Sequence, residues 1–225
     1  MSTAVPVPTV TVRGEALLVV DPEIADLGVT VRVRARDRET ALERVRARQD
    51  DVTAAVRAAG DAVETAETTR VAVYPGSRPD GAPGDPVASQ HTRITVGRLD
   101  AVGDLLVALG RLDDVEVSGP SWGLRPDSPA YEQARLAAVT DAVRRARTYA
   151  AAFGAELTAL LEVSDAGMSG GLRVAGAMET VALSVPGGLH LDLTPARSEV
   201  HGAVEVRFAM SAPDSGTWST EVFRG

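Results

Sequence analysis

One continuous stretch decides the fold: Tyr131-Glu-Gln-Ala-Arg-Leu-Ala-Ala-Val-Thr-Asp-Ala-Val-Arg-Arg-Ala-Arg-Thr-Tyr-Ala-Ala-Ala-Phe-Gly154, which runs directly into Ala155-Glu-Leu-Thr-Ala-Leu-Leu-Glu-Val163. The first part is rich in alanine, has no internal glycine or proline, and stops at Gly154. These features are typical of a long helix that ends at a glycine. A strand over Glu156–Val163 is expected to follow at once.

The sequence also predicts how this helix begins and what it packs against. Asp127 or Ser128 is placed to cap its first turn, and Pro129 suits a first helical position. Because alanine side chains are short, an alanine-lined face allows a helix to lie close to its neighbour. The predicted inner face consists of Tyr131, Ala134, Ala138, Ala142, Tyr149 and Phe153.

The composition is that of a folded protein with few aromatic side chains. Of its 225 residues, 44% are hydrophobic and 4% are aromatic. This length suffices for one large domain or two small ones, with a core built mainly from Val, Leu and Ala. Cysteine is absent, which excludes disulfides, thiolate catalysis and cysteine-based zinc sites. We expect no cofactor.

The charged residues exclude further classes of function. All 23 basic residues are arginines, so lysine Schiff-base chemistry and a lysine-dependent phosphate loop are excluded. The net charge of −8 argues against nucleic-acid binding through phosphate contacts. Before Arg13 there is no basic segment and no long apolar run, and no stretch approaches the roughly 20 apolar residues of a membrane helix. We expect a cytoplasmic protein that does not insert into membranes.

Hydrophobic periodicity predicts a mixed fold before the long helix. Leu27 to Ala35 alternates between apolar and polar residues, which indicates a strand with one buried face. After Asp37, a capping residue, the apolar residues recur with helical period. The expected elements, in order, are a strand at 9–13 ended by Gly14, a strand at 27–35, a helix from 38 to 60, a strand at 63–74, a flexible connection at 75–89, a strand at 90–99, a short helix capped by Asp100, and a strand at 115–124.

The order from residue 27 to residue 124 is strand, helix, strand, strand, helix, strand, which is the ferredoxin-like βαββαβ order. We therefore expect an α+β fold in which two helices cover one face of an antiparallel sheet. A single domain is expected over 1–225. Its parts are a βαββαβ half at 9–125, the long helix with additional antiparallel strands at 126–211, and a polar tail at 212–225.

The best candidate metal site lies near the C-terminal end of the sequence. If 189–193 and 198–202 pair as a hairpin, two histidines and two carboxylates share one face. Such a set suits Zn²⁺ or another divalent cation. The alternative is that no hairpin forms and that these are separate surface residues, which is the more common outcome. The four candidate ligands are His190, Asp192, Glu199 and His201.

Two charged groups are better explained by structure than by chemistry. Arg32, Arg34 and Arg36 form a row on one strand face. It suits an anion or an acidic partner or, more often, is a solvated face or one paired with Glu64 and neighbouring acids on the next strand. Four acids near the first turn favour turn and capping roles, because paired-carboxylate catalysis needs burial or a close partner to shift a pKa. They are Glu15, Asp21, Glu23 and Asp26.

The aromatic residues and the histidines do not indicate an active site. We expect Trp122 and Tyr149 in the core, whereas Trp218 and Phe223 lie in a polar tail and suit an interface. The serines and the three histidines show no nucleophile-elbow spacing, so a hydrolase is the least favoured function.

Several motifs, in their order along the chain, resemble the SIMPL-domain proteins, which include bacterial periplasmic immunogenic proteins and oxidative-stress defence factors. Val10-Thr-Val-Arg-Gly-Glu15 is similar to the opening strand of that family, and Asp21-Pro-Glu-Ile-Ala-Asp-Leu-Gly-Val29 to its turn into the next strand. Glu67-Thr-Thr-Arg-Val-Ala-Val-Tyr-Pro75 resembles the strand that ends in Tyr-Pro. The alanine-rich helix through Gly154 and the strand Val200–Met210 complete the resemblance.

The resemblance implies an α+β fold, a tendency to form ring-like oligomers, and no established catalytic residues. Typical members begin with a signal peptide, which is not seen here. The resulting hypothesis is a non-enzymatic, self-associating scaffold or interaction protein, related to stress or the envelope, whose alanine-faced helices and strand edges offer the contacts. The alternative is a protein that binds a small ligand or a divalent metal with its C-terminal strands and the loop at 165–177.

Overall fold

A computed structural model describes residues 7–77, 82–165, 191 and 193–214, and its fold is α+β, as expected. The chain divides into two compact units. The first unit takes its described residues from 1–20, 126–175 and 199–225, and the second from 21–125 and 176–198. The strand at the start of the chain therefore belongs with the long helix and not with the 9–125 half in which the sequence analysis placed it.

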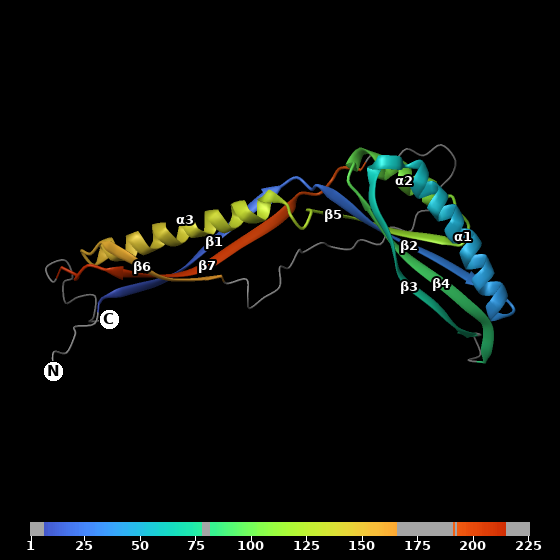
Figure 1. The fold of residues 1–225 in the computed structure, drawn as a ribbon, viewed down its shortest axis with the longest axis horizontal. Helices are drawn as coiled ribbons and strands as arrows, with labels where there is room; N and C mark the ends of the chain where they lie inside the picture. The colour runs from blue at the N-terminus through green and yellow to red at the C-terminus, as the bar shows by residue number, and fades with distance from the viewer. Residues whose placement is uncertain (1–6, 78–81, 166–190, 192, 215–225) are drawn as a thin grey trace. The chain divides into compact units, whose positions relative to one another are not determined.

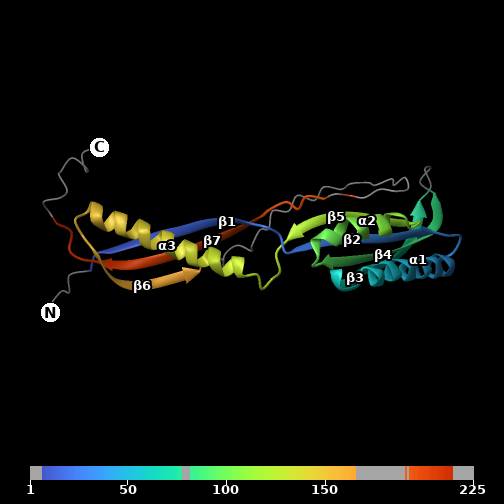
Figure 2. The same cartoon turned by 90° about the horizontal axis from the view of Figure 1, so that it is seen from above.

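The second unit is a four-stranded antiparallel sheet covered by helices on one face. Its strands lie side by side in the order β3-β4-β2-β5, which can be followed in Figure 2. The predicted order of strands and helices is confirmed in this part of the chain. The elements are β2 (Ile24–Arg34), α1 (Arg38–Ala58), β3 (Val63–Ser77), β4 (Pro83–Val96), α2 (Val102–Gly110) and β5 (Val115–Gly123).

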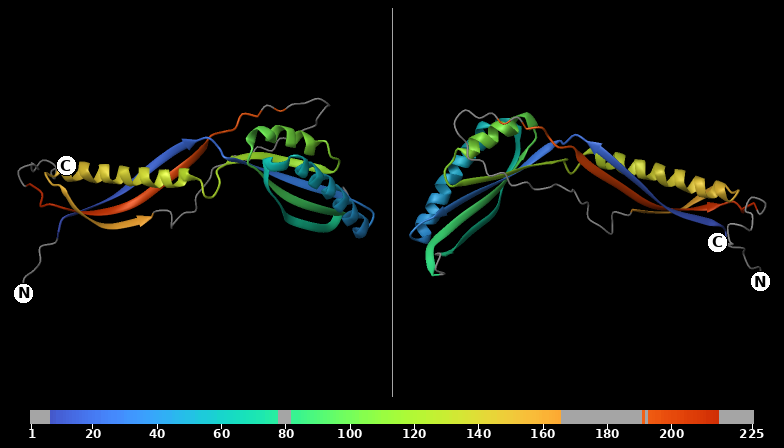
Figure 3. Two further views of the ribbon diagram at one scale, coloured as in Figure 1. Left: turned by 45° about the horizontal axis from the view of Figure 1, so that its top comes forward. Right: turned by 180° about the vertical axis from the view of Figure 1, so that it is seen from behind.

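Alternation along β2 determines which face the helices cover. Leu27, Val29 and Val31 are buried, whereas Arg32 and Arg34 are exposed. Helices α1 and α2 lie together on the buried face, as Figure 3 shows, and supply Val45, Val52, Leu105, Leu106 and Leu109 to the same core. The opposite face of the sheet is polar.

The connection predicted at 75–89 is too long, because β3 extends into it as far as Ser77 and β4 begins at Pro83. Gly76 is paired with Gly84, and Ser77 with Pro83. Proline is tolerated on an edge strand and at the first position of a strand, which is where Pro75 and Pro83 lie. A Cβ at Gly76 would stand 2.1 Å from the carbonyl oxygen of Asp85, so glycine here permits close strands and does not break them.

The two helix starts in the second unit differ in how well the sequence predicts them. Asp37 caps α1, since its Oδ1 accepts a hydrogen bond of 2.8 Å from the backbone N–H of Thr40. The predicted Asp100 cap is wrong. A 3₁₀ turn at Leu99–Ala101 precedes α2, whose N-cap position is Ala101, and Asp100 instead forms an ion pair with Arg98 at 3.5 Å.

The first unit is a three-stranded sheet with one long helix along it. Its elements are β1 (Thr9–Val20), α3 (Pro129–Ala152), β6 (Leu157–Asp165) and β7 (Ser198–Met210). The strand order is β1-β7-β6, and α3 runs along β1 and β7 (Figure 1). Ser128 is the N-cap of α3, with its Oγ accepting a hydrogen bond from the backbone N–H of Ala130 at 3.3 Å.

A stripe of alanines joins α3 to the sheet. Every fourth residue of the helix is buried, which is the spacing that keeps side chains on one face. The members of this alanine stripe are Ala130, Ala134, Ala138, Ala142, Ala146 and Ala150. The expected inner face is confirmed at its three alanines, but Tyr149 is 54% exposed and the prediction that it is a core residue is wrong.

Two glycines in the strands allow the helix backbone to approach. A Cβ at Gly14 of β1 would stand 2.1 Å from the carbonyl oxygen of Ala138, and a Cβ at Gly202 of β7 would stand 2.1 Å from that of Ala134. Atoms that are not bonded do not come so close, so any larger residue forces the helix away. The sequence predicts that Gly14 ends its strand. This prediction is wrong, because Gly14 lies in the interior of β1.

We predict that Gly14→Ala lowers the free energy of unfolding of the first unit by about 1–3 kcal/mol, the usual effect of overpacking. Thermal unfolding followed by circular dichroism measures the change. Gly123→Ala is the matched control, because a Cβ there has its nearest neighbour, Ile24 Cγ1, at 4.0 Å. Equal melting temperatures for the two variants would show that the close approach does not limit stability.

Candidate functional site

The predicted metal set can be placed only in part. Glu199 and His201 lie on the exposed face of β7, with Glu199 Oε2 at 3.9 Å from His201 Nε2. His190 and Asp192 lie outside the described residues. In the part of the chain that the structure describes, no three residues of the types His, Asp and Glu gather in a way that would hold a metal ion. The four-ligand site therefore stays a prediction.

The four acids near the first turn are hydrogen-bond and ion-pair partners, but the predicted turn and capping roles do not hold for all of them, because Glu15 lies inside β1 and Asp26 inside β2. Each of the four contacts a different group. The partners are the Arg13 side chain at 2.9 Å for Glu15, the Arg197 side chain at 3.0 Å for Asp21, the backbone N–H of Arg125 at 3.1 Å for Glu23, and the Thr95 hydroxyl at 2.6 Å for Asp26.

The arginine row lies on the solvated polar face of the second unit. Arg32, Arg34 and Arg36 are exposed, and Arg36 pairs with Asp37 at 3.3 Å. The suggested pairing of the row with Glu64 is wrong, because the side chain of Glu64 binds the guanidinium of Arg125 instead.

A half-buried polar contact lies beside this row. His91 Nδ1 and Thr30 Oγ1 are 2.9 Å apart across β2 and β4, and Ser118 Oγ donates a hydrogen bond of 3.2 Å to the carbonyl of Gly28. A Cβ at Gly28 would meet Ser118 Oγ at 2.5 Å. Since these side chains fill the space above Gly28, the residues bind one another and not a ligand.

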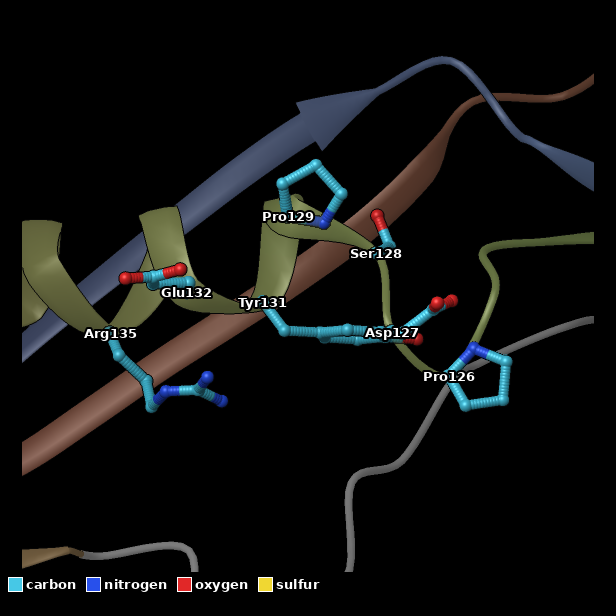
Figure 4. Close-up of a pocket in the computed structure, with 7 residues that line it drawn as sticks. All are labelled: Pro126, Asp127, Ser128, Pro129, Tyr131, Glu132 and Arg135. Carbon is cyan, nitrogen blue, oxygen red and sulfur yellow. The ribbon is translucent and has the colours of Figure 1, made fainter.

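A shallow depression surrounds the start of α3. Its volume is about 420 Å³, and it is lined by Pro126, Asp127, Ser128, Pro129, Tyr131, Glu132 and Arg135. Figure 4 shows that these residues come from one continuous stretch, the turn before α3 and its first turns. Its polar groups are the Ser128 cap and the charged side chains of Asp127, Glu132 and Arg135.

A larger groove lies between α3 and β6. This α3–β6 groove has a volume of about 530 Å³. Its walls are mainly apolar and carry one basic and one acidic side chain. The lining residues are Val143, Arg147, Ala150, Ala151, Ala155, Glu156, Leu157, Thr158, Ala159, Leu160 and Phe208. It is more apolar than the depression at the start of α3.

Exposed apolar side chains continue beyond the groove. On β6, Leu160 is 58% exposed, Leu161 48% and Val163 55%. On α3, Leu136 and Val139 are also exposed. The sequence does not predict this surface, because two adjacent leucines in a short apolar strand are equally typical of a fully buried strand. The spacing of Leu136, Val139 and Val143 gave the one usable signal, a second helical stripe.

Asp141 is the acid that most directly links α3 to the sheet. The backbone N–H of Glu15 in β1 donates a hydrogen bond of 3.1 Å to its Oδ2. This bond and then the guanidinium of Arg144 hold the pKa of Asp141 below its ordinary value of 3.8, and Arg145 acts in the same direction. Hydrogen bonds from Thr40 similarly lower the pKa of Asp37. Both shifts come from structural contacts, and neither acid lies in the α3–β6 groove.

Comparison with known proteins gives a family match. The family model "SIMPL: Protein of unknown function (DUF541)" matches residues 10–208. No curated protein matches the chain. Within the described part of the chain, no helix has the length and apolar character required to cross a bilayer.

We predict that Asp141→Asn destabilises the protein at neutral pH and that the difference from the unmodified protein disappears in acid. The folded-state pKa is lowered, so the carboxylate stabilises the fold above its unfolded pKa of about 4 and loses this effect as the pH falls through the folded value. Thermal unfolding at a series of pH values measures this, with Asp50→Asn on the exposed face of α1 as control. A destabilisation that is the same at pH 7 and in strong acid would contradict the assignment.

Proposed function

The chain belongs to the SIMPL family, and from the geometry of its first unit we propose that it is a non-enzymatic, self-associating interaction protein. Copies of the chain bind one another through the two outer strands of the sheet β1-β7-β6, whose outer sides pair with no strand among the described residues. The observation that carries this proposal is the exposed apolar surface of β6.

Strand β6 is an edge strand. It pairs with β7 on one side, and on its other side no described strand is paired with it. The backbone N–H and C=O groups of such an edge are a template for another chain. Because Leu161 and Val163 are exposed along this edge, pairing would also remove apolar surface from water.

A second copy is the occupant that fits this edge. The same sheet has a second edge at β1, which also carries exposed apolar side chains, Leu17 and Val19. Pairing of β6 in one copy with β1 in the next continues the sheet from chain to chain. Contacts of this head-to-tail kind close into rings or grow into filaments, according to the rotation between copies.

The alanine-faced helix does not supply this contact, which corrects the sequence-based expectation. All six alanines of the stripe are buried, and Ala138, Ala142 and Ala146 pack in one core with residues of β1 and β7. The surface left for association is therefore the edge of the sheet together with the second stripe of α3, in which Leu136 and Val139 are exposed.

Metal or small-ligand binding remains the alternative function. Among the described residues it rests on Glu199 and His201, which lie on one face of β7. Both side chains are well exposed, and two ligands hold a divalent metal weakly. We rank this function second for that reason.

We predict that the purified protein has a solution mass several times that of one chain, 23.4 kDa, and that the double variant Leu161→Lys, Val163→Lys has the mass of one chain. Lysines on an edge strand oppose pairing because of their charge. Light scattering measures the mass.

The control is Leu42→Lys on α1, which alters an apolar residue of similar exposure in the second unit and should keep the mass of the unmodified protein. A single-chain mass for the unmodified protein at high concentration, or an unchanged mass for the double variant, would refute self-association through β6.

A further inference from the structure

We propose that residues 215–225 of this chain bind in the α3–β6 groove of the same chain, with Trp218 and Phe223 as apolar anchors. This contact is separate from the pairing of sheet edges, because it uses the face of β6 that looks toward α3. It does not depend on self-association.

The groove has the chemistry of a site for an apolar segment with a few charges. Val143, Leu157, Leu160 and Phe208 provide apolar walls, and the volume of about 530 Å³ is within the range of sites that hold large side chains. Arg147 also lines the groove and forms no ion pair with any residue that the structure describes.

The described chain ends beside this groove. The backbone N–H of Ser211 donates a hydrogen bond of 2.9 Å to the carbonyl of Glu156, and the Ser211 hydroxyl accepts one of 3.0 Å from the N–H of Glu156. The N–H of Asp214 donates a bond of 3.2 Å to the carbonyl of Phe153. These bonds hold residues 211–214 at the turn between α3 and β6, where the groove begins.

The length of the segment fits the groove. Eleven residues follow Asp214, and an extended chain of this length reaches about 36 Å. The part of β6 that lines the groove, Leu157 to Leu160, is about 13 Å long, so the segment can span it. Trp218 is the fourth residue after Asp214, so it can reach the start of the groove without any change in the described chain.

The composition of the segment also fits. Ser215-Gly-Thr-Trp-Ser-Thr-Glu-Val-Phe-Arg-Gly225 contains one of the two tryptophans and one of the three phenylalanines of an aromatic-poor chain. Large aromatic side chains gain most from burial. Glu221 and Arg224 have charges opposite to those of Arg147 and Glu156 in the groove, so the two surfaces are complementary in charge.

Tryptophan fluorescence of the full chain tests this inference. In a Trp122→Phe background, Trp218 is the single tryptophan, and its emission maximum reports burial. We expect a maximum about 10–20 nm shorter than that of the denatured chain, as for an indole removed from water. Leu160→Glu in the groove should return it to the solvent-exposed position. Leu42→Glu, a matched change in the second unit, should leave it unchanged.

The Trp122→Phe variant could fail to fold, since Trp122 packs against the core of the second unit. A second measurement avoids this substitution. Fluorotryptophan-labelled protein gives separate ¹⁹F signals for the two indoles, and Leu160→Glu should shift only one of them. A solvent-exposed Trp218, or a signal insensitive to Leu160→Glu, would overturn the proposal. If dilution dissociates an oligomer and the blue shift is lost at the same dilution, the segment binds in a second copy. This result would also overturn the proposal.

Discussion

The first unit depends on the close approach of α3 to its sheet. Six alanines spaced four residues apart present a nearly flat helix surface, and Gly14 and Gly202 open the strands beneath it. The contact requires the glycines as well as the alanine stripe, because a Cβ at either glycine would overlap a backbone oxygen of the helix. The hydrogen bond from Glu15 to Asp141 fixes the helix at the same place along β1.

A narrow contact of this kind leaves apolar surface uncovered. The stripe packs on β1 and β7, where Val12, Val204 and Phe208 complete the core. Strand β6 contributes mainly Leu157 to that core, and its remaining apolar side chains stay exposed. An α3 with larger side chains would cover more of the sheet but could not lie so close. The exposed edge and the groove are thus consequences of the alanine contact, and both proposed interactions use surface that it leaves free.

The sequence predicted the elements of the second unit well, because alternation in β2 and the cap at Asp37 are local signals. It failed where tertiary contacts override local preference. The local sequence predicts that Gly76 and Gly14 end their strands. In the structure each glycine instead allows a neighbouring backbone to come close. The sequence does not predict the α3–β6 groove for a similar reason. Whether Leu160 is buried depends on how far α3 extends over β6, and a local sequence pattern does not determine this. The metal ligands were chosen from an assumed pairing that the described residues do not test.

Native-state hydrogen exchange tests whether the alanine contact makes β1, α3 and β7 one cooperative unit. With increasing denaturant, the amides of β1 should lose protection together with those of α3 and at a different denaturant concentration from those of β2. If β1 loses protection together with β2, which follows it in the chain, the contact between α3 and the two glycines does not hold the unit together, and the account is wrong.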